Sequence, residues 1–209
     1  MWEKESEGDG MSEHYYTQTP GGAHDRRLHE SELRGRRYRF VTDSGVFSKS
    51  GVDFGSRLLI ETMDFPAEAR VLDVGCGYGP IGLSAAVLAS EGTVTMIDIN
   101  ERAIELATEN ARLNGIANVR ILQSDLYEAV RAELYQVILT NPPIRAGKET
   151  VHRIYEEGAA LLESGGAMWV VIQKKQGAPS TLAKLEQLFD TVQEMTKDKG
   201  YRIFKAVKA

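Results

Sequence analysis

Two short segments of this 209-residue chain carry residues that could act together on a ligand. Segment 73–79 (DVGCGYG) follows an apolar run, and segment 141–144 (NPPI) follows a later one. Gly75, Gly77 and Gly79 allow the backbone to turn tightly and to approach a ligand closely at the start of a helix. The two segments predict one site in which a bound donor faces a polar acceptor turn.

The residues around the glycines indicate which donor binds. An NAD-binding turn would need glycine at position 80, where this chain has Pro80, a residue suited to the first turn of a helix. The Asp73 carboxylate would repel a pyrophosphate, but it can order the loop and face the amino end of a methionine-type ligand. This turn, Cys76 included, therefore predicts S-adenosyl-L-methionine as the cofactor. An NAD-dependent oxidoreductase is the disfavoured alternative.

Polar residues after the next two apolar runs extend the predicted donor site. Asp98 follows Gly75 by 23 residues and can accept both ribose hydroxyl groups, as in NAD enzymes. Ile99 belongs to the same predicted site. Asn100 could share this role, but its position favours an N-cap of the following helix. Ser124 and Asp125 could receive the adenine amino group or could equally cap a helix. The predicted cofactor-binding set is Asp73, Gly75, Cys76, Gly77, Gly79, Asp98, Ile99, Ser124, Asp125 and Asn141.

The segment 141–144 is predicted to hold an amino group for methylation. Its prolines stiffen the turn, so the Asn141 amide oxygen and the Pro142 carbonyl point in fixed directions. An amino group on an aromatic ring is a poor nucleophile, and two acceptors can orient it and stabilise its developing charge. The predicted catalytic residues are Asn141, Pro142, Pro143 and Ile144. A turn that merely ends a strand is the alternative interpretation.

The apolar runs from residue 69 onward predict an α/β fold with a seven-stranded, mostly parallel sheet and helices on both faces. A short turn between the last two runs predicts a C-terminal antiparallel hairpin. The predicted strands are 70–74, 93–97, 119–122, 135–139, 168–172, 191–196 and 201–207, and the predicted helices are about 80–90, 101–113, 125–132, 148–163 and 180–189. Asn114-Gly115 and the segment 164–166 are the expected helix stops.

The chain is expected to form one domain with a polar arm. Residues 1–35 are polar and form the predicted arm, expected to be mobile or loosely packed, in which Met11 is a plausible start. Residues 36–209 form the predicted domain. Segments 38–41 and 46–47 suggest a short hairpin before a helix around residues 58–63. No apolar run is long enough for a membrane span or a signal peptide, so a cytoplasmic protein is expected.

Composition argues against a metal or disulfide protein. Cys76 is the single cysteine, and the four histidines lack metal-ligand spacing. The net charge of −5 hides an uneven distribution. Residues 1–10 are acidic, whereas residues 26–39 carry six arginines against two glutamates and could meet phosphates or form a solvated surface. Oligomeric state is left open.

The motifs also resemble a known family. Segments 43–48 (DSGVFS), 71–79, 141–144 and 173–177 (QKKQG) are similar to those of RsmC-like 16S ribosomal RNA guanine-N2 methyltransferases, which have the Rossmann-like class I methyltransferase fold. The resemblance runs from about Arg36 to the end of the chain. It implies methylation of a guanine amino group in 16S rRNA, with naked RNA or an assembled small ribosomal subunit as partner.

Two departures from the family leave the RNA contacts open. Many relatives have an aromatic residue where this chain has Ile144, so Phe47 is the candidate to stack on a flipped base, with a slight preference for a core role instead. We expect this chain to lack the extra N-terminal domain of longer members. RNA contacts are therefore expected from the segment 26–39 with Arg36 and Arg37, from the hairpin, and from the loop with Lys174 and Lys175. Adenine-N6 or protein-glutamine methylation and a non-catalytic ribosome-assembly protein are the other functions considered.

Overall fold

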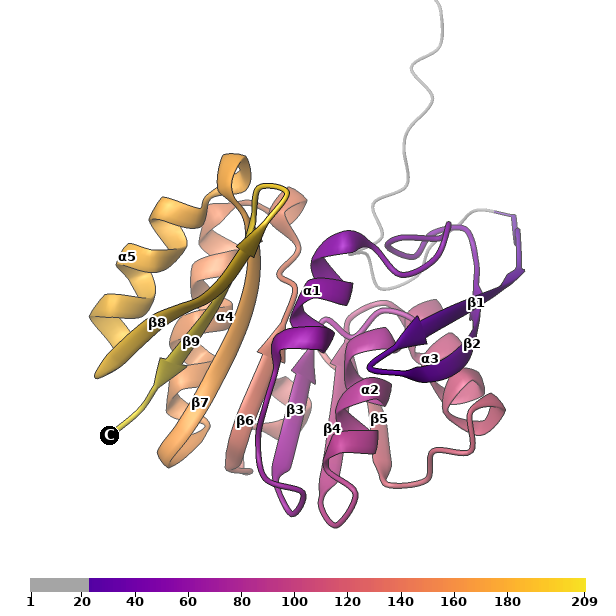
Figure 1. The fold of residues 1–209 in the computed structure, drawn as a ribbon, viewed down its shortest axis with the longest axis horizontal. Helices are drawn as coiled ribbons and strands as arrows, with labels where there is room; N and C mark the ends of the chain where they lie inside the picture. Colours follow the sequence, from indigo (N-terminus) through magenta and orange to yellow (C-terminus); the bar gives the residue numbers. More distant parts are fainter. Residues whose placement is uncertain (1–22) are drawn as a thin grey trace, which may run out of the picture.

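The computed structural model describes residues 23–209, and its centre is one mixed sheet (Figure 1). The strand order is β5-β4-β3-β6-β7-β9-β8. The first five strands in this order pair in parallel, whereas β9 pairs antiparallel with both β7 and β8. The strands of this sheet are β3 (Arg70–Val74), β4 (Thr93–Asp98), β5 (Val119–Gln123), β6 (Tyr135–Thr140), β7 (Leu162–Gln173), β8 (Thr191–Asp198) and β9 (Tyr201–Val207). The predicted seven-stranded α/β fold with a C-terminal hairpin is confirmed.

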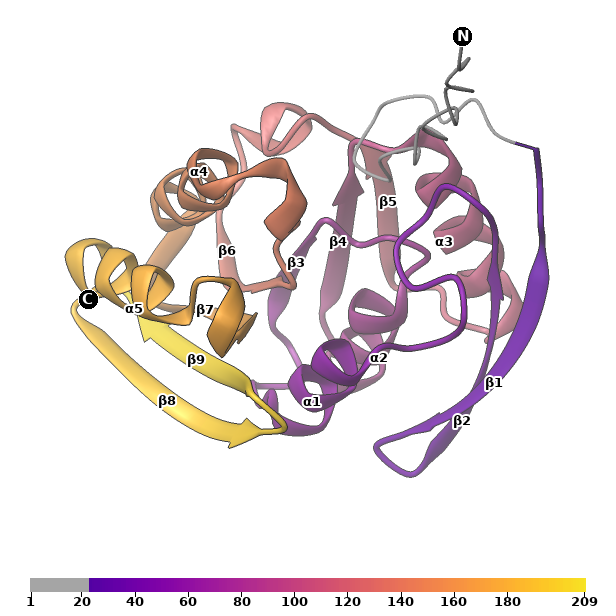
Figure 2. The same cartoon turned by 90° about the horizontal axis from the view of Figure 1, so that it is seen from above.

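Helices cover both faces of the sheet (Figure 2). Successive strand residues point to opposite faces, so Val71 packs in one apolar core and its neighbour Leu72 in the other. The first core lies under α1, α2 and α3, and the second under α4 and α5. The helices are α1 (Phe54–Thr62), α2 (Pro80–Leu88), α3 (Glu101–Leu113), α4 (Lys148–Ala160) and α5 (Ala178–Leu188), with the short 3-10 helices η1 (Glu128–Val130), η2 (Ile144–Ala146) and η3 (Lys174–Gln176).

Two predicted helices differ from those observed. The helix expected over 125–132 is reduced to η1, because the Ser124 hydroxyl binds the Ala129 N–H and turns the chain tightly. The helix expected to reach residue 163 ends at Ala160, and segment 164–166 lies inside β7 instead of stopping a helix. The prediction of helix 101–113 is confirmed, since Asn100 caps its start and Asn114 its end.

The predicted hairpin is displaced along the chain. The observed antiparallel pair is β1 (Arg27–Leu33) with β2 (Arg36–Thr42), joined at Arg34 and Gly35, both with positive φ. The turn expected at residues 43–45 instead starts a loop that reaches α1. The sequence of β1 has few apolar residues, so its pairing with β2 leaves little periodic signal. Residues 27–35 thus belong to the ordered hairpin, while the part of the predicted arm at 1–22, with Met11, lies outside the described residues.

The hairpin is fixed to α3 by two asparagines one turn apart. The Asn110 side chain accepts from the Val41 N–H at 2.7 Å and donates to the Val41 carbonyl at 3.0 Å. Asn114 makes the same pair of bonds with Arg39, at 2.9 and 2.7 Å. These amides replace the partner strand that the outer edge of β2 would otherwise lack. Within residues 23–209, no helix is long and apolar enough to cross a membrane.

Candidate active site

A cavity of about 900 Å³ lies at the carboxyl ends of the parallel strands, where open α/β sheets bind ligands. Its walls come from chain segments that are far apart in the sequence. They include residues 45–50, 74–78, 97–100, 124–126, 141–146 and 171–173. The cavity therefore brings the predicted donor turn and the predicted acceptor turn together.

The glycine turn forms the donor side of this cavity. Gly75 and Gly77 have φ of +73° and +55°, and no atom lies within 4 Å of where a Cβ would stand. Their backbone is therefore bare toward the cavity they line. Gly79 differs, because a Cβ there would stand 3.1 Å from Leu83 and 3.2 Å from Met96. It packs at the start of α2 and is not among the lining residues, and its predicted contact with the cofactor stays a prediction.

Asp98 connects the glycine turn to the end of β4. Its two carboxylate oxygens accept from the Gly77 N–H at 2.8 Å and from the Asn100 N–H at 2.9 Å. Burial raises the pKa of Asp98, although these N–H groups oppose the shift. Asn100 caps α3 by accepting from the Arg102 and Ala103 N–H groups, as predicted. Asp98 lines the cavity with lone pairs left to accept further bonds, and its contact with ribose stays a prediction.

Asp73 does not face the cavity as predicted. Its side chain is fully buried, and neither carboxylate oxygen has a hydrogen-bond partner of good geometry within residues 23–209. It lies against α2, since a Cβ on Gly82 would stand 2.8 Å from Asp73 Oδ2. Burial raises its pKa to about 7, and the negative charge of Asp98 adds to the shift. Asp73 is not among the residues that line the cavity, and its contact with the amino end of the cofactor stays a prediction.

The remaining predicted donor residues all line the cavity, and some of them also bond to other parts of the chain. Cys76, Ile99, Ser124 and Asp125 all line it. Burial raises the pKa of the Cys76 thiol well above its usual range, so this thiol stays protonated and apolar in character. The Ser124 hydroxyl accepts from the Ala129 N–H of η1 and donates to the Leu126 carbonyl, and its contact with adenine stays a prediction. Asp125 keeps its predicted role toward adenine as a prediction.

The acceptor turn follows β6 and is tied to α1. The Asn141 amide nitrogen donates to Ser56 Oγ at 3.0 Å and to Asp53 Oδ2 at 3.5 Å. Asn141, Pro142, Pro143 and Ile144 all line the cavity, and Ile144 begins η2. Asp53 and Ser56 were not predicted as site residues. Their only sequence signal is an aspartate at a helix N-cap position, which says nothing about a partner 88 residues away.

Phe47 is a cavity residue and not a core residue. Its side chain is 42% exposed, and it lines the cavity within the loop that precedes α1. The slight preference for a core role is therefore wrong. Val46, its neighbour, takes the core position at 7% exposure, within a loop made of turns. Lys49, which also lines the cavity, was missed by the sequence reasoning.

Most arginines of the segment 26–39 form bonds within the molecule. Arg34 binds the carbonyl groups of Ile60, Glu61 and Met63 at the end of α1. Arg36 binds the Asn114 carbonyl at 2.8 Å and stacks over Tyr38, with its guanidinium 5.3 Å from the ring centroid. Helix C-termini attract cations, so this segment has an internal role that neither sequence interpretation considered. Exposed Arg37 lies on β2, away from the cavity lining.

The predicted lysines lie next to the cavity without lining it. Lys174 and Lys175 are exposed in η3. Gln173, just before η3, and Gln176, its last residue, line the cavity. Two arginines that were not predicted do line it, Arg145 from η2 and Arg153 from α4. The cationic residues therefore gather on the acceptor side of the cavity.

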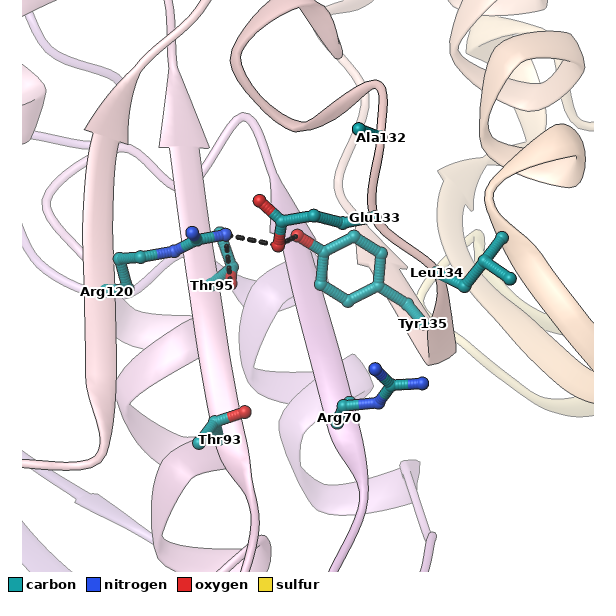
Figure 3. A pocket seen from close by; sticks show the side chains of 8 residues that line it. All are labelled: Arg70, Thr93, Thr95, Arg120, Ala132, Glu133, Leu134 and Tyr135. Carbon is teal, nitrogen blue, oxygen red and sulfur yellow. Dashed lines mark hydrogen bonds and ion pairs between the residues drawn. The ribbon is translucent and has the colours of Figure 1, made fainter.

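A second hollow, of about 520 Å³, lies at the opposite edge of the sheet (Figure 3). It is lined by residues at or near the amino ends of strands, where Arg120 forms an ion pair with Glu133 and also contacts Thr95. The charges there are largely neutralised, and none of the predicted site residues lies in it. Among the described residues, no group of three or more His, Cys, Asp or Glu side chains could hold a metal.

Fold and cavity together define a class I methyltransferase, and comparisons with known proteins give the family. Residues 37–205 match the model of the methyltransferase small domain, so the chain belongs to that family. Over 200 residues it is 56% identical to "Uncharacterized protein YbxB" of Bacillus subtilis (strain 168). The aligned region covers 95% of this chain and all of that protein.

Two further relatives are longer than this chain. The ribosomal RNA small subunit methyltransferase C of Hamiltonella defensa is 30% identical over 184 residues, which span 84% of this chain and 53% of the relative. The structure of the T. thermophilus 16S rRNA N2-guanine methyltransferase (RsmC), solved with AdoMet and guanosine, superposes with a TM-score of 0.78 at 26% identity, over 88% of this chain and 51% of that chain. This chain thus spans about half the length of both.

S-adenosylmethionine is the cofactor of this family of enzymes, and the cavity fits it. The open space beside Gly75 and Gly77 accommodates a ligand against bare backbone, and the Asp98 carboxylate lies next to that space as an acceptor for hydroxyl groups. When bound, the cofactor supplies a methyl group that is already activated on a sulfonium.

Proposed function

We propose that this chain methylates the N2 amino group of a guanine in the 16S RNA of the small ribosomal subunit. The observation that carries the proposal is a single cavity lined both by the bare glycine turn and by Asn141, whose amide nitrogen is already bound by Ser56. The amide oxygen is then the end of Asn141 that serves the cavity. Such an acceptor suits a neutral amino group that donates hydrogen bonds.

The acceptor turn would act by orientation and charge stabilisation. The Asn141 amide oxygen and the Pro142 carbonyl accept the two N–H hydrogens of the guanine amino group. They direct its lone pair toward the donor side of the cavity and stabilise the positive charge that grows on the nitrogen. The proton of the product then leaves to water. Pro142 and Pro143 keep these acceptors in place, because their rings fix the backbone φ angles.

Guanine is favoured over other amino-bearing substrates by the relatives and by the rim of the cavity. The T. thermophilus structure was solved with guanosine, and the small-subunit relative from Hamiltonella defensa is named for ribosomal RNA. Phe47 and Ile144 both line the cavity here, so Phe47 can supply the aromatic surface for a flipped base that Ile144 cannot.

The rim of the cavity has the charges that an RNA backbone needs. Arg145 lines the acceptor side, and Lys174 and Lys175 lie beside it in η3. Lys49 lines the cavity from the loop before α1, and Arg153 lines it while it is paired with Glu157. Contacts of this kind with phosphates position an RNA without reading its sequence. The overall charge of −5 does not oppose this, because the cations gather on one side of the cavity.

The direct test is methylation of ribosomal particles from cells that lack the protein. Purified chain and S-adenosylmethionine labelled on the methyl group are incubated with 30S subunits, naked 16S RNA and 50S subunits. Label in 16S RNA that a nucleoside digest identifies as N2-methylguanosine is the expected result. Comparing 30S subunits with naked RNA shows which form is the substrate.

The other outcomes of this test would each overturn the proposal. N6-methyladenosine in the digest, label in 50S RNA, or label in a protein glutamine would keep the enzyme class and change the substrate. If the parent chain labels no particle and the Asn141→Ala variant still restores ribosome assembly, the chain is a binding protein. Mass spectrometric mapping of 16S RNA with and without complementation identifies the nucleotide.

A further inference from the structure

The turn at residues 141–144 does not by itself determine which end of the Asn141 side-chain amide faces the cavity. The two ends of an asparagine amide have almost the same shape, but one donates hydrogen bonds and the other accepts them. The prolines that follow fix the position of the turn and leave the side-chain amide able to rotate by half a turn. A flipped amide would present N–H groups to the cavity, and these would oppose an amino group.

Asp53 decides which end of the amide faces the cavity. Its carboxylate only accepts hydrogen bonds, and Oδ2 lies 3.5 Å from the Asn141 amide nitrogen. In the flipped orientation two oxygens would face each other there. Ser56 Oγ, which could accept or donate, is 3.0 Å from the same nitrogen and anchors it. Asp53 and Ser56 thus keep the Asn141 amide nitrogen bonded to the start of α1, and the amide oxygen faces the cavity.

The first turn of α1 is itself held rigidly. Asp53 is the N-cap of the helix, and the same Oδ2 accepts from the Ser56 N–H at 3.0 Å. Ser56 is 3% exposed. Tyr201 of β9 packs so closely that a Cβ on Gly55 would stand 2.8 Å from its ring, which also lies 5.6 Å from the Phe54 ring. The two residues that hold Asn141 are therefore fixed before any substrate arrives.

We infer that Asp53 and Ser56 are positioning residues for the methyl-transfer reaction, which act by fixing the Asn141 amide with its oxygen toward the acceptor. The inference rests on the proposed function, because it assigns Asn141 the role of hydrogen-bond acceptor for an amino group. An acceptor already oriented in the free enzyme stabilises developing charge without first having to reorganise. The effect of Asp53 and Ser56 should therefore appear in the rate of transfer and not in the affinity for the cofactor.

Two variants test the inference while preserving the helix. Ser56→Ala removes the hydroxyl that binds the Asn141 amide. Asp53→Ser keeps a residue that caps helices well, but its short side chain cannot reach Asn141. The matched control is Ser84→Ala, because Ser84 is also a buried helical serine, 2% exposed, and its hydroxyl donates to the Pro80 carbonyl at 2.8 Å.

The first readout is kinetic and uses the full chain with 30S subunits and S-adenosylmethionine. Each test variant should lower kcat roughly tenfold, with the dissociation constant for S-adenosylmethionine unchanged within about twofold. The decisive comparison is with Asn141→Ala. If Asp53 and Ser56 act through Asn141, adding Ser56→Ala to Asn141→Ala should cause no further loss of kcat. Additive losses, or variants with the kcat of Ser84→Ala, would overturn the inference.

The second readout needs no RNA and so separates this inference from the proposed function. The side-chain amide of Asn141 gives an NMR signal that is assigned by its loss in Asn141→Ala. In the parent chain we expect its hydrogens to exchange slowly with water and its resonance to be displaced downfield. Both features should be lost in Ser56→Ala and kept in Ser84→Ala. An unchanged amide signal in Ser56→Ala overturns the positioning role, whereas an absence of RNA methylation by the parent chain overturns the proposed function.

Discussion

The donor side and the acceptor side of the cavity are built by different means. The donor side consists mainly of backbone, because Gly75 and Gly77 adopt positive φ and line the cavity without a side chain. The acceptor side depends on side chains that meet from distant elements, since Asn141 and Ser56 are 85 residues apart. One side is therefore a local property of the chain and the other is a property of the tertiary structure.

This difference explains how the two sides should respond to mutation. A change in the glycine turn alters backbone strain and cofactor affinity, and it leaves the acceptor turn in place. A change at Asn141 removes an oriented acceptor without touching the glycine turn. The two sides meet only through the position of the methyl group relative to the acceptor nitrogen, so cofactor affinity and transfer rate should be separable.

The largest effect is expected for Asn141→Ala. Loss of an oriented polar group that stabilises developing charge costs roughly 100-fold to 1000-fold in kcat, whereas cofactor affinity should stay within about twofold. Single-turnover methylation of 30S subunits measures the first quantity and calorimetric titration with S-adenosylmethionine the second. A parallel loss of cofactor affinity would show that the two sides are not separable.

The next largest effect concerns stability and comes from Asp73→Asn. The pKa of Asp73 is raised by burial from 3.8 to about 7 in the folded chain, so the folded state holds its proton more tightly than the unfolded state. Stability from this group is present at low pH and is lost as the pH rises from about 4 to about 7. Asparagine carries no charge that must be buried. The free energy of unfolding of the variant should therefore exceed that of the parent by on the order of 2 kcal/mol between pH 5 and pH 8.

Thermal unfolding of both proteins across this pH range measures the gain. Asp64→Asn is the control, because Asp64 is an exposed aspartate in the loop between α1 and β3. A stability difference between Asp73→Asn and the parent that does not change with pH would contradict the assignment of the raised pKa to Asp73.

The parts of the fold that the sequence predicted well are encoded by neighbouring residues. Helix α3 was predicted with its observed bounds because Asn100 caps one end and Asn114-Gly115 ends the other. Pro80 at the first turn of α2 is a similar local signal. The donor turn is also local, because glycine adopts its positive φ angles without strain.

The parts that the sequence did not predict depend on contacts between distant segments. Strand β1 is recognisable only through its pairing with β2, and the arginines of that hairpin reveal their role only against the ends of α1 and α3. Asp73 has the sequence position of a ligand-binding carboxylate, but its side chain is fully buried and lies against α2. The contact of Asp53 with Asn141 has no sequence signal, since nothing local relates an N-cap to a turn 88 residues later.

A smaller effect is expected for Gly77→Ala, which tests the backbone character of the donor side. Alanine at φ +55° is strained by about 1–2 kcal/mol, and the turn can relieve the strain by shifting the N–H that binds Asp98. Cofactor affinity should fall roughly tenfold while kcat at saturating cofactor is kept. Gly115→Ala is the matched control, because Gly115 has φ +66°, equally open space and no place in the cavity lining. Equal losses of affinity in both variants would mean that general destabilisation, and not the turn, is responsible.

The smallest effect is expected for Arg145→Glu, which tests whether the acceptor side meets RNA phosphates. Arg145 is exposed and lines the cavity. Losing one phosphate contact should raise KM for 30S subunits several-fold and reduce the slope of log affinity against log salt by about 1. The cofactor affinity should not change. Arg70→Glu at the opposite edge of the sheet is the control, because Arg70 pairs with Glu163 at the surface and lines the other hollow. If Arg70→Glu raises KM as much as Arg145→Glu does, the RNA is not confined to the acceptor side of the active-site cavity, and net charge alone accounts for its attraction.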